Sequence, residues 1–195
     1  MKMNDSTTLS NERSFWNNKY RTDKIGSGRG SRGKFARKKK SIIQSIIDKQ
    51  NIRSVLDLGC GDLFWIKDLN VKDYVGVDFS DVTLENNKKL RPDWKFYTFD
   101  FSKREVPWKA ELVLLIDILQ HQPTIKQYKK VFENAVNSAT KYLIVTSWKK
   151  KQKFQQKNNV WFYETLNELL HGYTYDSLYS YRKHLMCLIY KKQEK

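Results

Sequence analysis

The sequence predicts an α/β protein in which seven strands form one doubly wound, mostly parallel sheet. Three observations support this fold class. Short apolar segments with strand character alternate along the chain with helical segments, which is typical of βαβ units. A glycine-containing turn, GCGD at residues 59–62, directly follows the first apolar segment. The last two strand-like segments, residues 173–181 and 185–190, are separated by a short basic turn, so they must pair antiparallel.

The chain begins with a basic, glycine-rich arm, residues 1–33, that shows little periodicity. Glycine-rich stretches of this kind are typical of a loop that is flexible or that a ligand orders. The 195 residues are enough for one domain with its own core. We therefore predict two regions: the flexible arm, 1–33, and a single domain, 34–195.

Helices are predicted in five segments. Isoleucines recur at helical spacing in residues 35–50, which indicates one apolar stripe. Ser80 is a suitable N-cap for a helix over residues 81–90, and Pro123 stands just before the next one. The remaining predicted helices are residues 62–69, 124–137 and 162–170.

Strands are predicted at the apolar segments between these helices. The predicted strands before the final pair are residues 55–58, 74–77, 94–99, 112–116 and 142–146. Residues 112–116 are the most apolar of these, which favours burial on both faces of the sheet. Residues 149–159, KKKQKFQQKNN, are predicted to be a polar loop. Together the segments give a mostly parallel sheet with one antiparallel strand near its C-terminal edge.

The net charge of +16 lies mainly at the two ends of the chain, whereas the middle is close to neutral. Basic segments attract anionic partners, of which nucleic acid is the obvious one. A lysine-rich composition that binds nothing explains the same charge equally well, so both interpretations stay open.

The composition also indicates where in the cell the protein is expected and whether it holds a structural metal. Residues 1–14 are polar and do not resemble a secretory signal, and the longest apolar run is too short to span a bilayer. The two cysteines and three histidines show no metal-ligand spacing. We expect a reduced, cytoplasmic protein that has no structural metal and no membrane partner.

The turn after the first predicted strand indicates a ligand site, because ligands in such sheets bind at the carboxyl ends of the strands. Gly59 and Gly61 permit a close approach of the backbone to a ligand. A dinucleotide-binding turn needs a third small residue where this chain has Phe64, and no P-loop lysine follows. The turn therefore does not favour a pyrophosphate or a nucleoside triphosphate.

Acidic residues end the second, third and fourth predicted strands, at Asp78, Asp100 and Asp117. Carboxyl ends of parallel strands meet at one edge, so these acids are expected to line one cleft. Carboxylates attract an amine or another cation and repel phosphate. A ligand that combines an adenosine with a charged sulfonium amino acid fits this edge better than a pyrophosphate does.

Four segments together resemble motifs I to IV of the class I S-adenosylmethionine-dependent methyltransferases: VLDLGCGD, VGVDFS, FYTFDFS and ELVLLIDILQHQP, in this order. The resemblance covers residues 53–147 and implies a Rossmann-like sheet, S-adenosylmethionine as cofactor and methyl transfer as the reaction. The arm GSGRGSRG with DILQHQP is similar to a small, poorly characterised group of these enzymes. FWNNKY resembles a W-x-x-x-Y element that packs over the donor in several small-molecule methyltransferases.

The first motif supplies the methionyl end of the expected cofactor site. The resemblance implies that Gly59 and Gly61 contact the methionyl part of the donor through their backbone. Asp57 would orient its amino group, and Cys60, between the glycines, would serve as a small residue of the turn.

The second and third motifs supply the adenosine end. The resemblance implies that Asp78 binds the ribose hydroxyls and that Phe79 packs beside the adenine. Asp100 would accept from the adenine amino group, and Phe101 would donate its backbone N–H.

The fourth motif and the arm complete the expected site. The resemblance places Asp117 and Ile118 near the methionyl end of the donor, with Trp16 and Tyr20 as a cover. His121 follows Asp117 by four residues on the loop that faces the acceptor, and its ordinary pKa suits a general base. We predict His121 and Asp117 as the catalytic residues, with a purely structural loop histidine as the alternative.

Three functions remain open at this point. The first is methylation of a small or medium-sized acceptor, an anionic one included. The second is methylation of RNA or DNA held by the basic and aromatic ends of the chain. The third is a non-catalytic nucleic-acid-binding protein that retains a relict donor pocket.

Overall fold

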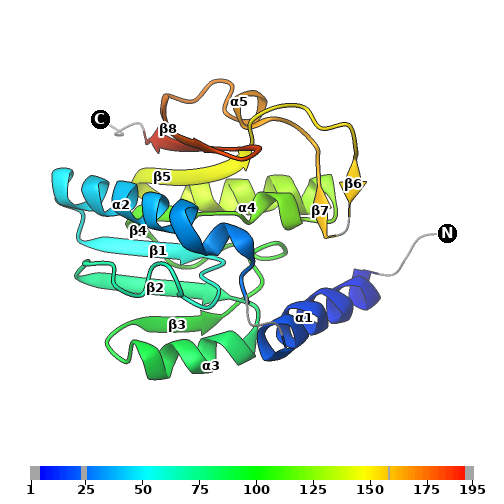
Figure 1. Ribbon diagram of the computed structural model, residues 1–195, viewed down its shortest axis with the longest axis horizontal. Coiled ribbons are helices and arrows are strands. Elements are labelled where there is room, and N and C mark those ends of the chain that lie inside the picture. Colours follow the sequence, from blue (N-terminus) through cyan, green and yellow to red (C-terminus); the bar gives the residue numbers. More distant parts are fainter. Residues whose placement is uncertain (1–4, 23–25, 158, 192–195) are drawn as a thin grey trace.

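Seven strands form one sheet in the order β3-β2-β1-β4-β5-β9-β8 in the computed structural model (Figure 1), which describes residues 5–22, 26–157 and 159–191. The strands are β1 (Ser54–Leu58), β2 (Asp73–Asp78), β3 (Lys95–Thr98), β4 (Ala110–Leu115), β5 (Ala139–Trp148), β8 (Tyr175–Tyr181) and β9 (His184–Tyr190). The pairs among β1 to β5 are parallel, whereas β9 runs antiparallel to both of its neighbours. The predicted sheet is confirmed, with one reversed strand between β5 and β8.

The strand order reverses at β1, which pairs with β2 on one side and with β4 on the other. In an open parallel sheet the crevice for a ligand lies at the carboxyl ends of the strands that flank such a reversal. The glycine turn follows β1 and Asp117 follows β4, so both lie at this crevice.

Helices cover both faces of the sheet. On one face, α2 (Gly33–Lys49) and α3 (Asp81–Leu90) contribute Ile43 and Leu84 to the core. On the other face lie α4 (Ile125–Ser138) and α5 (Leu166–Leu169). The residues of β4 alternate between the two cores and are almost all fully buried, as its apolar sequence predicts.

Side-chain caps fix where three of these helices begin. The Ser80 side chain accepts from the Thr83 N–H at the start of α3, and Thr124 accepts from Gln127 at the start of α4. Thr165 forms a reciprocal capping box with Glu168. The predicted helices at 81–90 and 124–137 are confirmed within one residue, whereas the helix predicted at 162–170 is reduced to the four residues of α5.

The helix predicted over residues 62–69 is wrong, because the chain there forms a series of turns. Leu63 has a φ of 53°, which a right-handed helix does not permit. The Asp62 side chain accepts from the N–H of Phe64, a local bond that competes with helix formation. The apolar periodicity of this segment serves core packing by Leu63, Ile66 and Leu69 instead.

The arm contains a helix that the sequence pattern did not predict, α1 (Asp5–Thr22), followed by a short 3-10 turn, η1 (Arg29–Ser31). Helix α1 lies beside α3 (Figure 1). Arg13 pairs with Asp81, and the Ser80 hydroxyl donates to Asn17 over 2.6 Å. The division of the chain into an arm and a domain at residue 33 stays a prediction.

Three short elements complete the described chain. The polar segment 149–159 contains β6 (Gln156–Lys157), which pairs with β7 (Val160–Trp161). A 3-10 turn, η2 (Leu119–His121), follows β4. Within the described ranges, we find no helix with the length and apolar character needed to cross a bilayer.

Candidate active site

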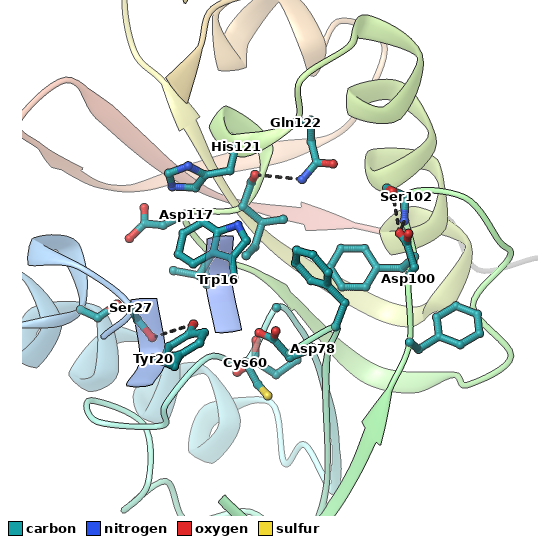
Figure 2. Close-up of a pocket in the computed structure, with 18 of the residues that line it drawn as sticks. Trp16, Tyr20, Ser27, Cys60, Asp78, Asp100, Ser102, Asp117, His121 and Gln122 are labelled. Carbon is teal, nitrogen blue, oxygen red and sulfur yellow. Dashed lines mark hydrogen bonds between the residues drawn. The ribbon is translucent and has the colours of Figure 1, made fainter. Parts of the chain in front are cut away.

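One pocket opens at the carboxyl ends of β1, β2 and β4, and the arm lies over it (Figure 2). The sequence-predicted residues that line it are Trp16, Tyr20, Asp57, Gly59, Cys60, Asp78, Phe79, Asp100, Phe101, Asp117, Ile118 and His121. Gly61 does not line the pocket but contacts Asp78 from the same turn. The structure thus brings these residues together, and the role of each stays a prediction.

The turn after β1 has room for glycine alone at its first position. Gly59 has a φ of 84°, and a Cβ there would lie 2.1 Å from Cδ1 of Ile118. Any side chain would therefore strain the backbone and displace Ile118. The absence of a side chain lets the loops after β1 and β4 meet at the pocket wall.

Asp78 and Asp57 are buried acids at the ends of β2 and β1. The two carboxylate oxygens of Asp78 accept from the N–H groups of Gly61 and Ser80 over 3.1 and 3.0 Å. Asp57 accepts from the Tyr74 hydroxyl over 2.7 Å. Burial raises the pKa of Asp57 to about 7 and that of Asp78 to about 6, and among the described residues neither acid forms an ion pair.

Asp100 lies at the far end of the pocket from Asp117 and His121 (Figure 2). Its Oδ1 accepts from the Ser102 hydroxyl over 2.6 Å and from the Ser102 N–H over 3.0 Å. Phe101 is buried beside it. This end combines a fixed carboxylate with aromatic surface, which suits a flat heteroaromatic group.

Asp117 has four polar contacts and a φ of 58°. Its Oδ2 accepts from the Lys39 ammonium over 2.6 Å, and its Oδ1 accepts from the hydroxyls of Tyr181 and Thr146. Its backbone N–H donates to Thr146 as well. Burial opposes ionisation, but Lys39, His184 and these hydrogen bonds lower the pKa of Asp117 to about 2, so this acid stays ionised.

Lys39 is the residue that sequence reasoning missed at this end of the site. It lies on α2, its side chain is fully buried, and its ammonium lies about 5 Å from the ring centres of Trp65 and Tyr181. The run RKKK gave no reason to single it out, yet Lys39 shares a helical face with Ile43 and Ile47 at i+4 and i+8. That spacing is the signal that would have placed it in the core.

His121 faces the pocket from η2. Its Nδ1 lies 2.7 Å from the carbonyl oxygen of Asn159, and because a carbonyl only accepts, Nδ1 carries the proton and Nε2 is an acceptor. The Trp16 ring meets the imidazole edge-on, with ring centres 5.3 Å apart. Burial lowers the pKa of His121, so the neutral form prevails at neutral pH.

The glycine-rich segment of the arm is held by Asp62, which sequence reasoning placed in the motif without a role. The Ser27 N–H and hydroxyl donate to the two oxygens of Asp62, and Arg32 pairs with Asp62 over 2.7 Å. Ser27 also lies 3.3 Å from the Tyr20 hydroxyl (Figure 2). These contacts hold Tyr20 above the glycine turn, and the Trp16 ring lies beside it, with ring centres 6.2 Å apart.

Further lining residues were not predicted from the sequence. They are Ser27, Ser31, Trp65, Phe99, Ser102, Ile116 and Gln122. Most of them lie within two residues of a predicted one, so proximity to the motifs was the available signal. Ser31 and Trp65 lie outside the motifs, and only the fold of the chain brings them to the pocket.

Solved structures similar to this chain include methyltransferases. The N-methyltransferase NodS of Bradyrhizobium japonicum WM9, in complex with S-adenosyl-L-homocysteine, superposes with a TM-score of 0.74 at 11% identity and covers 93% of this chain and 99% of its own. The DhpI-SAM-HEP complex reaches 0.72 at 11% identity, over 94% and 97% of the two chains.

Magnesium protoporphyrin IX methyltransferase (ChlM) of Synechocystis PCC 6803, with bound SAH, reaches a TM-score of 0.67 at 15% identity, over 93% and 100% of the two chains. No protein-family model matches the sequence, and no curated protein matches it. At identities of 11 to 15%, the similarity to these structures is one of fold. The chain has the fold of the class I S-adenosylmethionine-dependent methyltransferases.

Proposed function

We propose that the protein is a methyltransferase that uses S-adenosylmethionine as its cofactor. The observation that carries the proposal is the row of acids Asp57, Asp78 and Asp100, which face one pocket at the strand-order reversal beside the glycine turn. None of the three forms an ion pair within the part of the chain that the structure describes. The similar structures that hold S-adenosylmethionine or its demethylated product support the proposal.

The residues present fit this cofactor chemically. Each carboxylate oxygen of Asp78 accepts one backbone N–H and has a further acceptor site for a ribose hydroxyl. Asp57 would accept from an ammonium, and Asp100 with Phe101 would take the adenine. A phosphate group in the same place would be repelled by the acids.

When bound, the cofactor supplies a methyl group on a positively charged sulfur. The chain's own contribution is to hold and align, which is the larger part of catalysis for an in-line transfer. Trp16 and Tyr20 cover the pocket and exclude water. His121 offers the unprotonated Nε2 to the proton of an acceptor hydroxyl or amine, and the Asn159 carbonyl keeps the ring in that tautomer.

Isothermal titration calorimetry with S-adenosylmethionine tests the proposal. We expect saturable binding of one donor per chain, and competition by S-adenosyl-L-homocysteine. Absence of binding by a folded preparation contradicts the proposed function, whatever the acceptor.

Replacing the predicted base tests the chemistry separately from binding. His121→Gln removes Nε2 basicity, and general-base catalysis typically contributes a factor of about 10² to 10⁴. We expect transfer of labelled methyl to pooled RNA and metabolites to fall by about that factor, with donor affinity within about twofold of wild type. His171→Gln, a change at an exposed histidine, is the matched control. Equal activity of His121→Gln and wild type would remove His121 from catalysis.

The acceptor divides the remaining alternatives. The sequence favours a small or medium-sized acceptor first and RNA or DNA second, with the relict pocket third. Donor binding is expected for both enzymes and is also compatible with a relict pocket. Transfer of a methyl group distinguishes either enzyme from the relict pocket. Exposed cations on α2 and on the turn between β8 and β9 support the second acceptor class.

A further inference from the structure

A group of cations at the rim of the pocket is left without acidic partners. On α2, Lys34, Arg37 and Lys38 are exposed and form no ion pair with any residue that the structure describes. The next two lysines pair with Asp117 and Asp68. Elsewhere in the described chain some cations pair with acids, as Arg91 does with Asp93, and others do not. Lys34, Arg37 and Lys38 stand at positions i, i+3 and i+4 of α2, so their charges lie on one face of the helix.

The turn between β8 and β9 continues this positive surface. The guanidinium of Arg182 lies 5.2 Å from the centre of the Phe35 ring, and the Lys34 ammonium lies 5.5 Å from the same ring. The carbonyl of Lys183 accepts from the N–H of Lys149, which follows β5. Three separate segments therefore meet, and their exposed cations make one surface, the rim surface: Lys34, Arg37, Lys38, Lys149, Lys150, Arg182 and Lys183.

The rim surface adjoins the proposed active site. Tyr181 directly precedes Arg182 and donates to Asp117, which lines the pocket. Trp148 directly precedes Lys149 and pairs in register with His184 at the carboxyl end of β5. When one part of a ligand is bound to the rim surface, the adjacent part of the same ligand lies at the opening of the pocket.

The form of the surface indicates a polymer. A small anion is held by charges that converge on one point, whereas these cations are exposed and spread over three segments. Exposed lysines and arginines spread over a surface can each contact a phosphate of a nucleic acid backbone. A base or ribose in a stacked duplex does not reach an enclosed pocket, so a single strand fits.

We propose that the rim surface binds the phosphate backbone of a single-stranded nucleic acid and presents one of its nucleotides to the pocket as the methyl acceptor. The binding part of this inference stands on the charges alone, and the acceptor part rests on the proposed function.

Fluorescence anisotropy with a labelled 20-nucleotide single-stranded RNA of mixed sequence tests the proposal. With about four phosphate contacts, the slope of log K against log salt concentration is about −3 for a single strand, so affinity falls about fiftyfold between 50 and 200 mM salt. The variant Arg37→Gln/Lys150→Gln/Lys183→Gln removes one cation from each segment. We expect at least a tenfold loss of affinity and a slope that is shallower by about 2.

The matched control removes three cations near the amino ends of β1, β2 and β4, at the opposite end of these strands from the pocket, by Lys49→Gln/Lys72→Gln/Lys109→Gln. These side chains are exposed and lack ion pairs in the described structure, and the change in net charge is the same. We expect affinity within about twofold of wild type. Equal losses in the two variants would assign the binding to overall charge and overturn the proposal, as would binding of phosphatidylserine vesicles or polyglutamate as tight as that of RNA.

Donor calorimetry on the same preparations separates the two proposals. RNA binding without donor binding overturns the proposed methyltransferase function and keeps the rim surface. Donor binding without RNA binding overturns the rim surface and keeps the function. Circular dichroism melts confirm that both triple variants are folded.

Discussion

The pKa values of the acidic residues are shifted in opposite directions at the two ends of the pocket. At one end, burial raises the pKa of Asp57 to about 7 and that of Asp78 to about 6. At the other end, burial acts on Asp117 too, but Lys39 and the hydrogen bonds around the carboxylate lower its pKa to about 2. The difference is a fully buried lysine that forms its ion pair with Asp117 and none with Asp57 or Asp78.

Among the described residues, Asp57 and Asp78 therefore lack a cationic partner that a ligand could supply, whereas Asp117 already has one. A buried carboxylate without a cation is unfavourable, and a bound ammonium or pair of hydroxyls would offset that cost. Asp117 has a cation and two hydroxyls already. The catalytic role of Asp117 stays a prediction, and these contacts favour a positioning role in the pocket wall.

Breaking the ion pair is expected to give the largest effect. Lys39→Met leaves the Asp117 carboxylate, which is largely shielded from solvent, without its cation, and removing one partner of such an ion pair costs about 3 kcal/mol or more. Lys40→Met removes a pair in which both side chains are partly exposed, and such a pair contributes less than about 1 kcal/mol.

Urea unfolding of both variants measures these costs. A loss in Lys39→Met no larger than in Lys40→Met would show that Asp117 does not depend on Lys39. The double variant Lys39→Met/Asp117→Asn removes both charges and is expected to recover part of the stability, because the two effects are coupled.

Removing the charge of Asp78, at the opposite end of the pocket, is expected to weaken binding of the methyl donor. Asp78→Asn keeps the shape but weakens the acceptor for ligand hydroxyls, and hydrogen bonds to a charged group contribute about 1.5–3 kcal/mol. We expect donor affinity to fall about ten- to hundredfold in calorimetry. Asp73→Asn, at the exposed other end of β2, is the matched control; a similar loss there would mean that Asp78 has no special contact with the donor.

The smallest expected effect is a dependence of donor affinity on pH. Asp57 and Asp78 have raised pKa values, so they ionise as the pH rises through about 6 to 7. Donor affinity should therefore increase with pH, by roughly tenfold between pH 5 and 7.5 for one unit of pKa change on binding. Asp117, ionised throughout this range, contributes nothing to the dependence.

Calorimetry at several pH values checks this, with Asp57→Asn as the variant that should lose the part of the dependence near pH 7. A profile that is flat for the wild type would mean that neither acid faces the charged part of the donor.

The sequence by itself determined the order along the chain of the seven strands and of α2, α3 and α4. It also determined the glycine turn and the acids at the carboxyl ends of β2, β3 and β4. These features are local: a strand is apolar over a few consecutive residues, and Gly59 is needed because of its own φ. The resemblance of the motifs added the identity of the expected cofactor. Local reasoning failed at residues 62–69, where Leu63 adopts a positive φ that no pattern of apolar residues reveals.

Only the tertiary structure decided which acid is paired and what covers the pocket. Lys39 and Asp117 are 78 residues apart in the sequence, and Arg32 and Asp62 are 30 apart. The pKa of a carboxyl group and the docking of an arm depend on neighbours that the fold supplies, because Coulomb forces and desolvation act through space and not along the chain. For this reason the sequence could place the acids at one edge, and the fold alone could set their charge.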